Sequence, residues 1–330
     1  EGKGEYMSYT SIIGTGSYIP ENIIDNNYIS QFVDTSDEWI TERTGIKARR
    51  LSKGEDTSQL AIKAAQRAIE MAKINPEDIG LVILGTITPD TFTPSVACIV
   101  QSAIGAVNAT SFDISAACSG FIYGLQIADK FLQGSNMKYA LVIGSEVLSK
   151  ALDWEDRNTC VIFADGAGAA ILAKNEEYGI KASFSGSSGD VKGNLVLPAL
   201  QVNNLIAKSE NKNSVISMNG REIFKFAVQI MPKCINAVLE EANMSLEDID
   251  YIVPHQANYR ITESVAQKMN IPIEKFYMNL DEYGNTSSAT IPLALDEMNR
   301  KGMLKKGQKI ILVGFGGGLT WGSVLINWQG

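Results

Sequence analysis

The sequence predicts a layered α/β protein built from two duplicated halves. Apolar runs alternate with amphipathic helical patterns, which is typical of strands buried on both faces between helices. These patterns also repeat along the chain. PEDIGLVILG at 76–85 is similar to LEDIDYIVPH at 246–255, and ALVIGSE at 140–146 is similar to IILVGFG at 310–316. Both pairs lie 170 residues apart, so the two copies match here without net insertion.

Each copy contains the same elements in the same order. The first copy predicts helices at 57–73 and 121–133 and strands at 81–84, 110–116 and 140–143. The second predicts helices at 224–243 and 290–301 and strands at 251–253 and 310–313. Two Gly-rich stretches, 163–173 and 314–328, should each form a turn and a last apolar strand. Chemistry is then expected where the strand ends of the two halves meet.

These repeats predict an N-terminal half at 7–178 and a C-terminal half at 179–330. We interpret residues 1–6 as a polar tail or a cloning remnant ahead of Met7.

The composition excludes several classes of protein. The chain has 330 residues and a formal net charge of −8, and it lacks a run of Lys and Arg, so we expect no nucleic-acid partner. No apolar run reaches the roughly 18 residues of a membrane span, so we expect no membrane partner. A single histidine and no C-x-x-C spacing predict no metal site. Without a recognisable signal peptide, we expect a cytoplasmic protein with four free thiols.

Cys118 is the first candidate for chemistry. It lies in DISAACSGFIYGLQIAD, 113–129, where a predicted strand passes into a predicted helix. A helix N-terminus offers unpaired N–H groups and a partial positive charge, so we expect the thiol pKa to fall below its free value of about 8.5. Small neighbours leave room for an acyl group. The alternative is a buried structural cysteine.

His255 and Asn285 follow from the second copy. His255 comes directly after a predicted strand, and Asn285 lies in the turn sequence EYGNTSSATIP. Ser288 is the repeat equivalent of Cys118, so Asn285 should face the same pocket. The hydroxyl residues at 286–288 are candidate caps of the next helix. An ordinary core histidine and an ordinary turn asparagine remain the alternatives.

The order Cys, His, Asn is also that of a papain-like protease. The surroundings of Cys118 lack that family's signature, Cys118 is not near the N-terminus, and the α/β duplication is wrong for its fold. We therefore reject this interpretation.

Eight motifs together resemble the thiolase superfamily and, more narrowly, the β-ketoacyl-acyl-carrier-protein synthase III family. They are IIGTGSYIPE, DTSDEWITERTGI, AACSG, IFADGAGAAIL, MNGREIFKFA, VPHQAN, GNTSSA and FGGGLTWGS. The match runs from about Met7 to Trp328. The resemblance implies a thiolase-like fold of five layers, αβαβα, and a homodimer.

The resemblance also implies a decarboxylative Claisen condensation that initiates fatty-acid biosynthesis. Cys118 would take an acyl group from an acyl-CoA, and backbone N–H groups of Cys118 and Gly317 would form the oxyanion hole. Malonyl-acyl-carrier protein would then lose CO2 while His255 and Asn285 donate hydrogen bonds to its thioester carbonyl. The products would be 3-oxoacyl-carrier protein, CoA and CO2. No cofactor is implied, because the carrier's phosphopantetheine delivers the substrate.

Further residues match positions of this family that bind substrate or partner. The expected CoA and pantetheine contacts are Trp39, Arg43, Arg157, Gly220, Phe224 and Asn258. Candidates for docking the acidic carrier protein are Arg260, Lys225 and Lys268. Thr93 stands where acetyl-selective relatives carry a bulky aromatic that closes the acyl pocket across the dimer interface. A small residue there favours a primer longer than acetyl, although the neighbouring Phe92 could compensate.

Three other functions remain open from the sequence. One is a related CoA-dependent condensing acyltransferase of secondary metabolism, such as a type III polyketide synthase. Another is an inactive, binding-only paralogue, which the intact Cys118, His255 and Asn285 disfavour. The third is a hydrolase, which the lack of an obvious acid partner for His255 disfavours.

Overall fold

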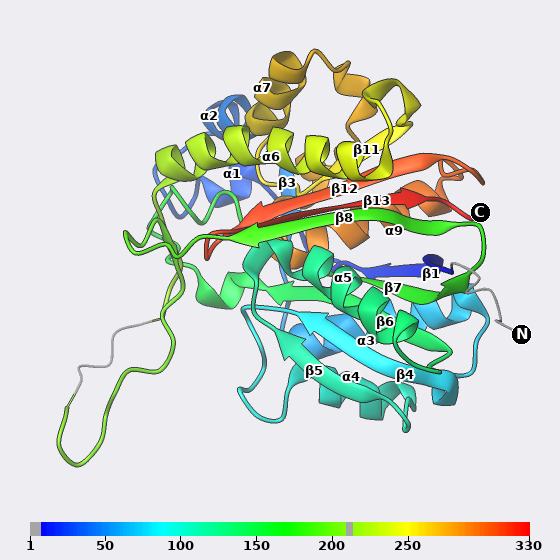
Figure 1. Cartoon of the computed structure of the whole chain (residues 1–330). Coiled ribbons are helices and arrows are strands. Elements are labelled where there is room, and N and C mark those ends of the chain that lie inside the picture. The colour runs from blue at the N-terminus through cyan, green and yellow to red at the C-terminus, as the bar shows by residue number, and fades with distance from the viewer. Residues whose placement is uncertain (1–7, 209–213) are drawn as a thin grey trace, which may run out of the picture.

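The computed structural model describes residues 8–208 and 214–330, and it has the five predicted layers in the order αβαβα (Figure 1). The tail expected at 1–6 lies outside the described residues. Two mixed sheets enclose a central helical layer, and further helices cover the outer face of each sheet. Among the described residues, no helix combines the length and apolar character needed to cross a membrane.

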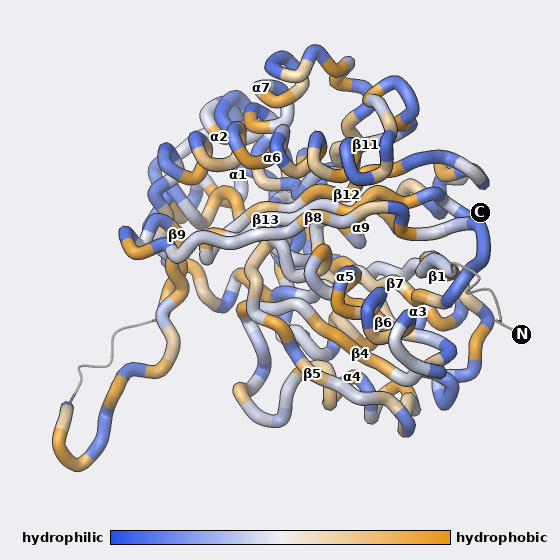
Figure 2. The backbone as a smooth tube through the Cα atoms, viewed as in Figure 1, coloured by the Kyte–Doolittle hydropathy of each residue, from blue (hydrophilic) through white to orange (hydrophobic). Residues whose placement is uncertain are grey.

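The first sheet has five strands in the order β1, β7, β6, β4, β5. Their bounds are β1 Tyr9–Tyr18, β4 Ile79–Gly85, β5 Thr110–Ile114, β6 Tyr139–Val147 and β7 Asp165–Asn175. β4 is parallel to β5 and to β6, so the C-terminal ends of these three strands lie at one edge. β4 is hydrophobic along its length, as a strand buried on both faces requires (Figure 2).

The second sheet has four strands in the order β11, β12, β13, β8. Their bounds are β8 Gly179–Ser187, β11 Tyr251–Pro254, β12 Lys309–Gly316 and β13 Thr320–Asn327. β11 is parallel to β12, and the other pairs are antiparallel. The ends of β11 and β12 therefore point the same way, toward the cysteine turn of the first half.

The longer helices supply the three helical layers. Their bounds are α3 Thr57–Ala72, α4 Val96–Ile104, α5 Gly120–Gln133, α6 Gly220–Ala242, α7 Tyr259–Met269 and α9 Thr290–Arg300. α3 and α4 pack on the first sheet, and α6 and α7 pack on the second. α5 and α9 lie between the sheets in one apolar core with residues from both. Burying both faces of each sheet holds the two halves together.

Short elements surround one end of the layers. They are α1 Asn26–Ile29, α2 Asp37–Thr44, α8 Leu280–Tyr283, and the strand pairs β2 Ile23–Asp25 with β3 Ala48–Arg50 and β9 Leu195–Val196 with β10 Ser217–Met218. Beyond β9 the chain reaches away from the layers as a long arm (Figure 1). Leu205 and Ile206 on this arm are almost fully exposed.

The predicted duplication is confirmed in the element bounds. The 3-10 turns Ala117–Ser119 and Ser287–Ala289 begin 170 positions apart, and α5 and α9 follow each turn directly. The outer helices α3 and α6 end on left-handed residues, Lys73 and Asn243, at the same spacing.

Two local predictions are wrong. The glycines of 163–173 lie inside strand β7 rather than in a turn, because α9 packs closely on that strand. A Cβ atom at Gly168 would lie 2.7 Å from the backbone N of Leu293. The hydroxyl residues at 286–288 do not cap α9, whose N-cap residue is Ala289 without a side-chain hydrogen bond. Ser288 instead donates to Gly85 O at 2.7 Å, which links the two halves.

Candidate active site

Cys118 lies between the two sheets, at the junction of β5 and α5. The turn Ala117–Ser119 carries it from the end of β5 to the start of α5, and its side chain is 6% exposed. The Gly-rich end of β12 makes this position possible, because a Cβ atom at Gly316 would lie 2.9 Å from both N and Cβ of Cys118. Because Gly316 has no side chain, Cys118 packs directly against the backbone of β12 in the second half.

The low pKa expected for the Cys118 thiol is wrong for this structure. Burial raises the pKa to about 12; the Ser287 hydroxyl lowers it, and the buried Glu146 carboxyl raises it further. Removing a thiolate from water costs more here than the helix N-terminus returns. The resting group is therefore the thiol, and its proton has to leave as the sulfur attacks.

His255 follows β11 directly and is 2% exposed. Its backbone N–H donates to Val313 O of β12 at 2.8 Å, and its Nδ1 lies 2.7 Å from Thr290 Oγ1 at the start of α9. The ring meets Phe315 edge-on, with 5.4 Å between centroids. Burial lowers the pKa of His255 to about 3, so the imidazole is neutral.

Asn285 is 5% exposed and is held by the strand-like segment before β7. Its backbone N–H donates to Ile162 O at 3.0 Å, and its carbonyl accepts from Ala164 N at 2.9 Å. Its Oδ1 accepts from Ser287 N at 2.8 Å, which leaves the Nδ2 group as the donor for another molecule. The tertiary structure thus places the predicted Cys118, His255 and Asn285 around one cavity of about 100 Å³.

Two larger cavities open from this central one. An apolar cavity of about 190 Å³ shares Cys118, Phe163 and Leu195 with it and continues between Ile87, Leu148, Leu197 and Ile216. An outer cavity of about 770 Å³ shares Ile162, Met218, Gly220 and Asn258 with it. The outer, central and apolar cavities therefore adjoin in that order, which suits a long arm carrying a small acyl group.

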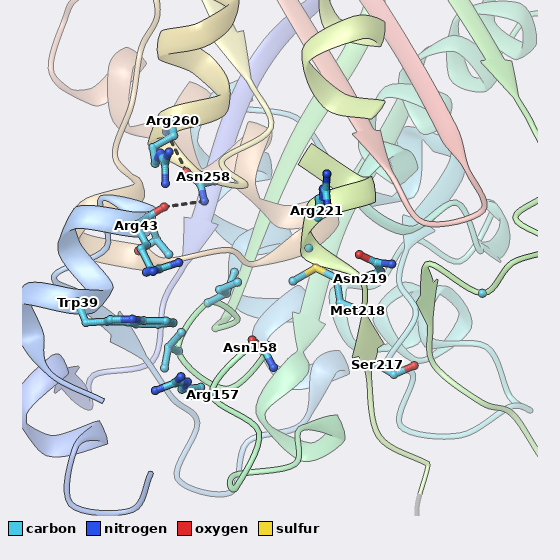
Figure 3. A pocket seen from close by; sticks show the side chains of 15 residues that line it. Trp39, Arg43, Arg157, Asn158, Ser217, Met218, Asn219, Arg221, Asn258 and Arg260 are labelled. Carbon is cyan, nitrogen blue, oxygen red and sulfur yellow. Dashed lines mark hydrogen bonds between the residues drawn. The ribbon is translucent and has the colours of Figure 1, made fainter. Parts of the chain in front are cut away.

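Aromatic and cationic side chains line the outer cavity. The Trp39 ring lies between the guanidinium groups of Arg43 and Arg157, whose Cζ atoms are 4.8 and 5.0 Å from its centroid (Figure 3). Arg221 and Arg260 also line this cavity, with Arg221 on the side opposite Trp39 (Figure 3). The four arginines of this cavity can bind phosphate groups, and the indole can stack against a purine.

The residues predicted to line the pantetheine tunnel also line these cavities. Gly220 and Asn258 line both the outer and the central cavity, and Phe224 lines the central one. Asn258 caps α7 by accepting from Arg260 N at 2.9 Å, and its Nδ2 donates to Arg43 O at 3.0 Å. Its side chain thereby joins α7 to the end of α2 at the mouth.

Of the remaining predicted residues, some line these cavities and others lie outside them. Gly317 lines the apolar cavity together with Cys118. Thr93 is exposed and lies outside the three cavities of its own chain, so its predicted role across a dimer interface stays a prediction. Of the predicted docking residues, Arg260 lines the mouth, whereas Lys225 and Lys268 are exposed on α6 and α7 outside the three cavities.

Sequence reasoning missed several residues of this site. They are the apolar lining Ile87, Leu148, Leu195 and Ile216, the mouth residue Arg221, the His255 partner Thr290, and Glu146 behind the thiol. Arg221 could have been found, because it is a cation next to Gly220 in a motif of the resemblance. The others carry no local signal, since only long-range packing brings them to the cysteine. In residues 8–208 and 214–330, no group of three or more His, Cys, Asp or Glu could hold a metal ion.

Comparisons with known proteins identify one family. The family model of 3-oxoacyl-[acyl-carrier-protein] synthase III matches residues 112–189, and the model of its C-terminal part matches 239–328. A β-ketoacyl-[acyl-carrier-protein] synthase III of Clostridium acetobutylicum is 56% identical, with 98% of this chain and 99% of the relative covered. One of Clostridium botulinum is 57% identical, with 98% and 100% covered.

Solved structures of a synthase of this description and of a polyketide-priming ketosynthase share the fold. The enzyme from Aquifex aeolicus is 46% identical with a TM-score of 0.90, covering 97% of this chain and 100% of that one. The priming β-ketosynthase of the R1128 polyketide pathway also has a TM-score of 0.90, but it is 31% identical, with 97% and 96% covered. The fold and the cysteine site define a thiolase-like acyltransferase. The chain belongs to the β-ketoacyl-[acyl-carrier-protein] synthase III family.

Proposed function

We propose that this enzyme condenses a short acyl-CoA with malonyl-acyl-carrier protein and so starts fatty-acid synthesis. The observation that carries the proposal is the central cavity lined by Cys118, His255 and Asn285, which shares residues with a cationic mouth and with an apolar cavity. A related enzyme of secondary metabolism is less favoured, because the curated relatives at 56–57% identity are synthases of the III type.

In the first half-reaction, the sulfur of Cys118 attacks the thioester carbonyl of the acyl-CoA and CoA leaves. The acyl chain occupies the apolar cavity, whose lining is mostly apolar. The backbone N–H groups of Cys118 and Gly317 stabilise the oxyanion that develops on the carbonyl. Gly317 suits this role because it lines the cavity beside the thiol without a side chain.

In the second half-reaction, malonyl-carrier protein enters by the same mouth and loses CO2. Nε2 of His255 and Nδ2 of Asn285 donate to the thioester oxygen as it becomes an enolate oxygen, and the enolate carbon attacks the acyl group on Cys118. Donation requires the proton of the neutral imidazole to be on Nε2. Thr290 supports this tautomer when its hydroxyl, which donates to Ser287 O at 3.1 Å in this structure, turns to donate to Nδ1 at 2.7 Å instead.

The mouth serves both substrates. Adenine of CoA stacks on Trp39 after one of the two guanidinium groups moves from the ring, and Arg43, Arg157 and Arg221 bind the phosphates. The acidic carrier protein docks on the same rim through Arg260. Lys225 is a weaker candidate, because its Nζ already pairs with Glu222 at 2.7 Å. Lys268 is a peripheral one on the last turn of α7.

We also propose a cytoplasmic homodimer. Phe92 is 71% exposed beside Thr93, and Leu205 and Ile206 are exposed on the arm, so a second copy would cover apolar surface. In that arrangement Thr93 can reach the apolar cavity of the partner and leave it open for primers longer than acetyl. The four free cysteines fit a reducing compartment.

Intact-mass spectrometry after incubation with acetyl-, butyryl- or octanoyl-CoA tests the first half-reaction, with Cys118→Ala as control. We expect an acyl adduct on the wild-type enzyme that maps to Cys118. We expect the strongest adduct from a primer that fits the apolar cavity. A wild-type enzyme that takes an acyl group from none of the three donors would overturn the acyl-CoA-primed reaction.

A further inference from the structure

We propose that Glu146 acts through the hydroxyl of Ser287 as the acceptor and later the donor of the Cys118 proton. This inference rests on the proposed function, because it concerns the proton that the thiol must lose when the acyl-enzyme forms. His255 and Asn285 serve the second substrate and leave this proton without an acceptor.

Glu146 is a fully buried carboxyl near the end of β6, behind the cysteine turn. Its Oε2 accepts hydrogen bonds from the hydroxyl groups of Thr86 and Thr88 and from the backbone N–H groups of Ile87 and Thr88. These donors come from the loop after β4 and hold the carboxyl in one orientation. One oxygen is thus saturated with donors.

The other oxygen, Oε1, faces the second half of the protein and has few donors. It shares the Ile87 N–H at 3.2 Å and lies 3.4 Å from Ser288 Oγ, whose own proton is donated to Gly85 O. Oε1 is therefore the oxygen that can take up a proton. It points toward the turn Ser287–Ala289, the repeat counterpart of the cysteine turn.

Ser287 begins the turn Ser287–Ala289, which packs both on β6, the strand that carries Glu146, and on the cysteine turn Ala117–Ser119. Its Oγ is buried and makes no hydrogen bond to any residue that the structure describes. Burial raises the pKa of the Cys118 thiol and of the Glu146 carboxyl, and the Ser287 hydroxyl lowers both. Ser287 also lines the apolar cavity with Cys118 and has a left-handed backbone, with φ of 53°. An unpaired buried hydroxyl is costly, and a relay between two proton-exchanging groups gives it partners.

The proton inventory of the reaction balances with this relay. As the sulfur forms its bond to the acyl carbon and the bond to the CoA sulfur breaks, the thiol proton passes to Ser287 Oγ and the Ser287 proton passes to Glu146 Oε1. The CoA thiolate leaves through the mouth and takes a proton from water. When the enolate carbon later takes the acyl group, the Cys118 thiolate recovers its proton from Glu146 by the reverse path.

The charges around Glu146 support the exchange. Burial raises the pKa of Glu146 to about 7, and hydrogen bonds from Thr88, Thr86 and Ile87, together with the nearby Ser287 hydroxyl, lower it. Within the described residues, the titratable group whose charge couples to Glu146 is Cys118, and the other groups facing it are hydroxyls and backbone N–H groups. When the proton moves from sulfur to the Glu146 carboxylate, the oxyanion of the attacked thioester is the one negative charge in the buried site. Releasing the proton to water would leave two negative charges there, the oxyanion and the carboxylate.

Single-turnover acylation by acetyl-CoA between pH 5.5 and 9 tests the relay, with the adduct on Cys118 measured by intact mass. We expect the wild-type rate to rise with pH to a plateau above about 7, as Glu146 ionises. Glu146→Gln should lower the plateau rate at least about tenfold and abolish the inflection, because the amide cannot accept the proton. Glu146→Asp should keep an inflection at a reduced rate.

Ser287→Ala should reproduce the loss seen in Glu146→Gln, and it carries the test if the glutamine variant does not fold. Ser323→Ala is the control, because it removes a buried hydroxyl that donates to Cys234 O at 2.7 Å and lines none of the three cavities. If Glu146 acted only through its negative charge, Glu146→Gln would lower the thiol pKa and accelerate acylation, which would overturn the relay. A wild-type enzyme that forms no adduct would instead overturn the proposed function itself.

Discussion

Ala117 and Ser287 adopt the same left-handed backbone, with φ of 46° and 53°, at positions 170 residues apart. Each is the first residue of a 3-10 turn that leads into a central helix. Side-chain-bearing residues rarely adopt such angles, so both turns are strained at the point where the two halves meet. The packing that holds them also places Cys118 and Asn285 beside one cavity.

Gly144→Ala should disrupt this packing. A Cβ atom at Gly144 would lie 2.1 Å from Ser288 O and 2.6 Å from Ser288 C, so the backbone of the second turn would have to move. We expect destabilisation of about 2–3 kcal/mol, measured by urea unfolding, and slower acylation of Cys118. Gly189→Ala is the control, because nothing lies within 4 Å of a Cβ atom there. Equal stability of the two variants would contradict this account of the turn.

Trp39→Ala should weaken the binding of acyl-CoA and spare the chemistry. The indole stacks with Arg43 and Arg157 and offers the aromatic face in the mouth. We expect KM for acetyl-CoA to rise about threefold to thirtyfold, the range of one stacking contact, with little change in kcat. Arg67→Ala, which removes a cation over the Tyr18 ring outside the three cavities, is the matched control. An unchanged KM in the Trp39 variant would place CoA elsewhere.

His255→Ala should separate the two half-reactions. The proposed role of the imidazole is to stabilise the enolate of the second substrate, so acylation of Cys118 by acetyl-CoA should remain within a few-fold of wild type. Condensation with malonyl-carrier protein should fall about 100- to 1,000-fold, as for loss of one oxyanion donor. Equal loss in both steps, measured by intact mass and by product formation, would assign His255 to the thiol instead.

Thr290→Val tests the orientation of that imidazole. Its hydroxyl is the neighbour of Nδ1 at 2.7 Å. Losing one hydrogen bond that fixes the tautomer should reduce condensation about threefold to tenfold and leave acylation unchanged. Thr290→Ser, which keeps the hydroxyl, should restore the rate, and a serine variant as slow as the valine variant would argue against the tautomer.

The pH dependence of stability should carry two opposite contributions. The folded pKa of Glu146 is raised from 4.5 to about 7, so its contribution is full below about pH 4.5 and is lost as pH rises through 7. The folded pKa of His255 is lowered from 6.5 to about 3, so its contribution is lost as pH falls from 6.5 toward 3.

Urea unfolding at pH 5 and pH 8 isolates the first contribution. From pH 5 to pH 8, the free energy of unfolding of Glu146→Gln should rise by roughly 2–3 kcal/mol relative to that of wild type, because the variant buries no charge at pH 8. A constant difference between the two proteins across this range would contradict a raised pKa for Glu146.

Much of the fold follows from local pattern. Strand β4 and helix α5 begin and end within two residues of the expected bounds, because apolar runs and helical periodicity are properties of neighbouring residues. Helix α6 begins at Gly220, four residues before the start predicted at 224, because Asn219 caps the helix ahead of its apolar stripe. The glycines of β7 were misread as a turn because the close approach of α9 is a long-range contact.

The sequence by itself determined the element order and the duplication, and it predicts Cys118, His255 and Asn285 as the site, since residue types and their spacing are written in the chain. Only the tertiary structure decided the protonation state of the thiol and imidazole, and the place of Glu146, Ser287 and Thr290 beside them. Burial and hydrogen bonding between distant segments set these properties. A helix N-terminus predicts a thiolate, but the free energy of removing charge from water depends on every layer that packs around the sulfur.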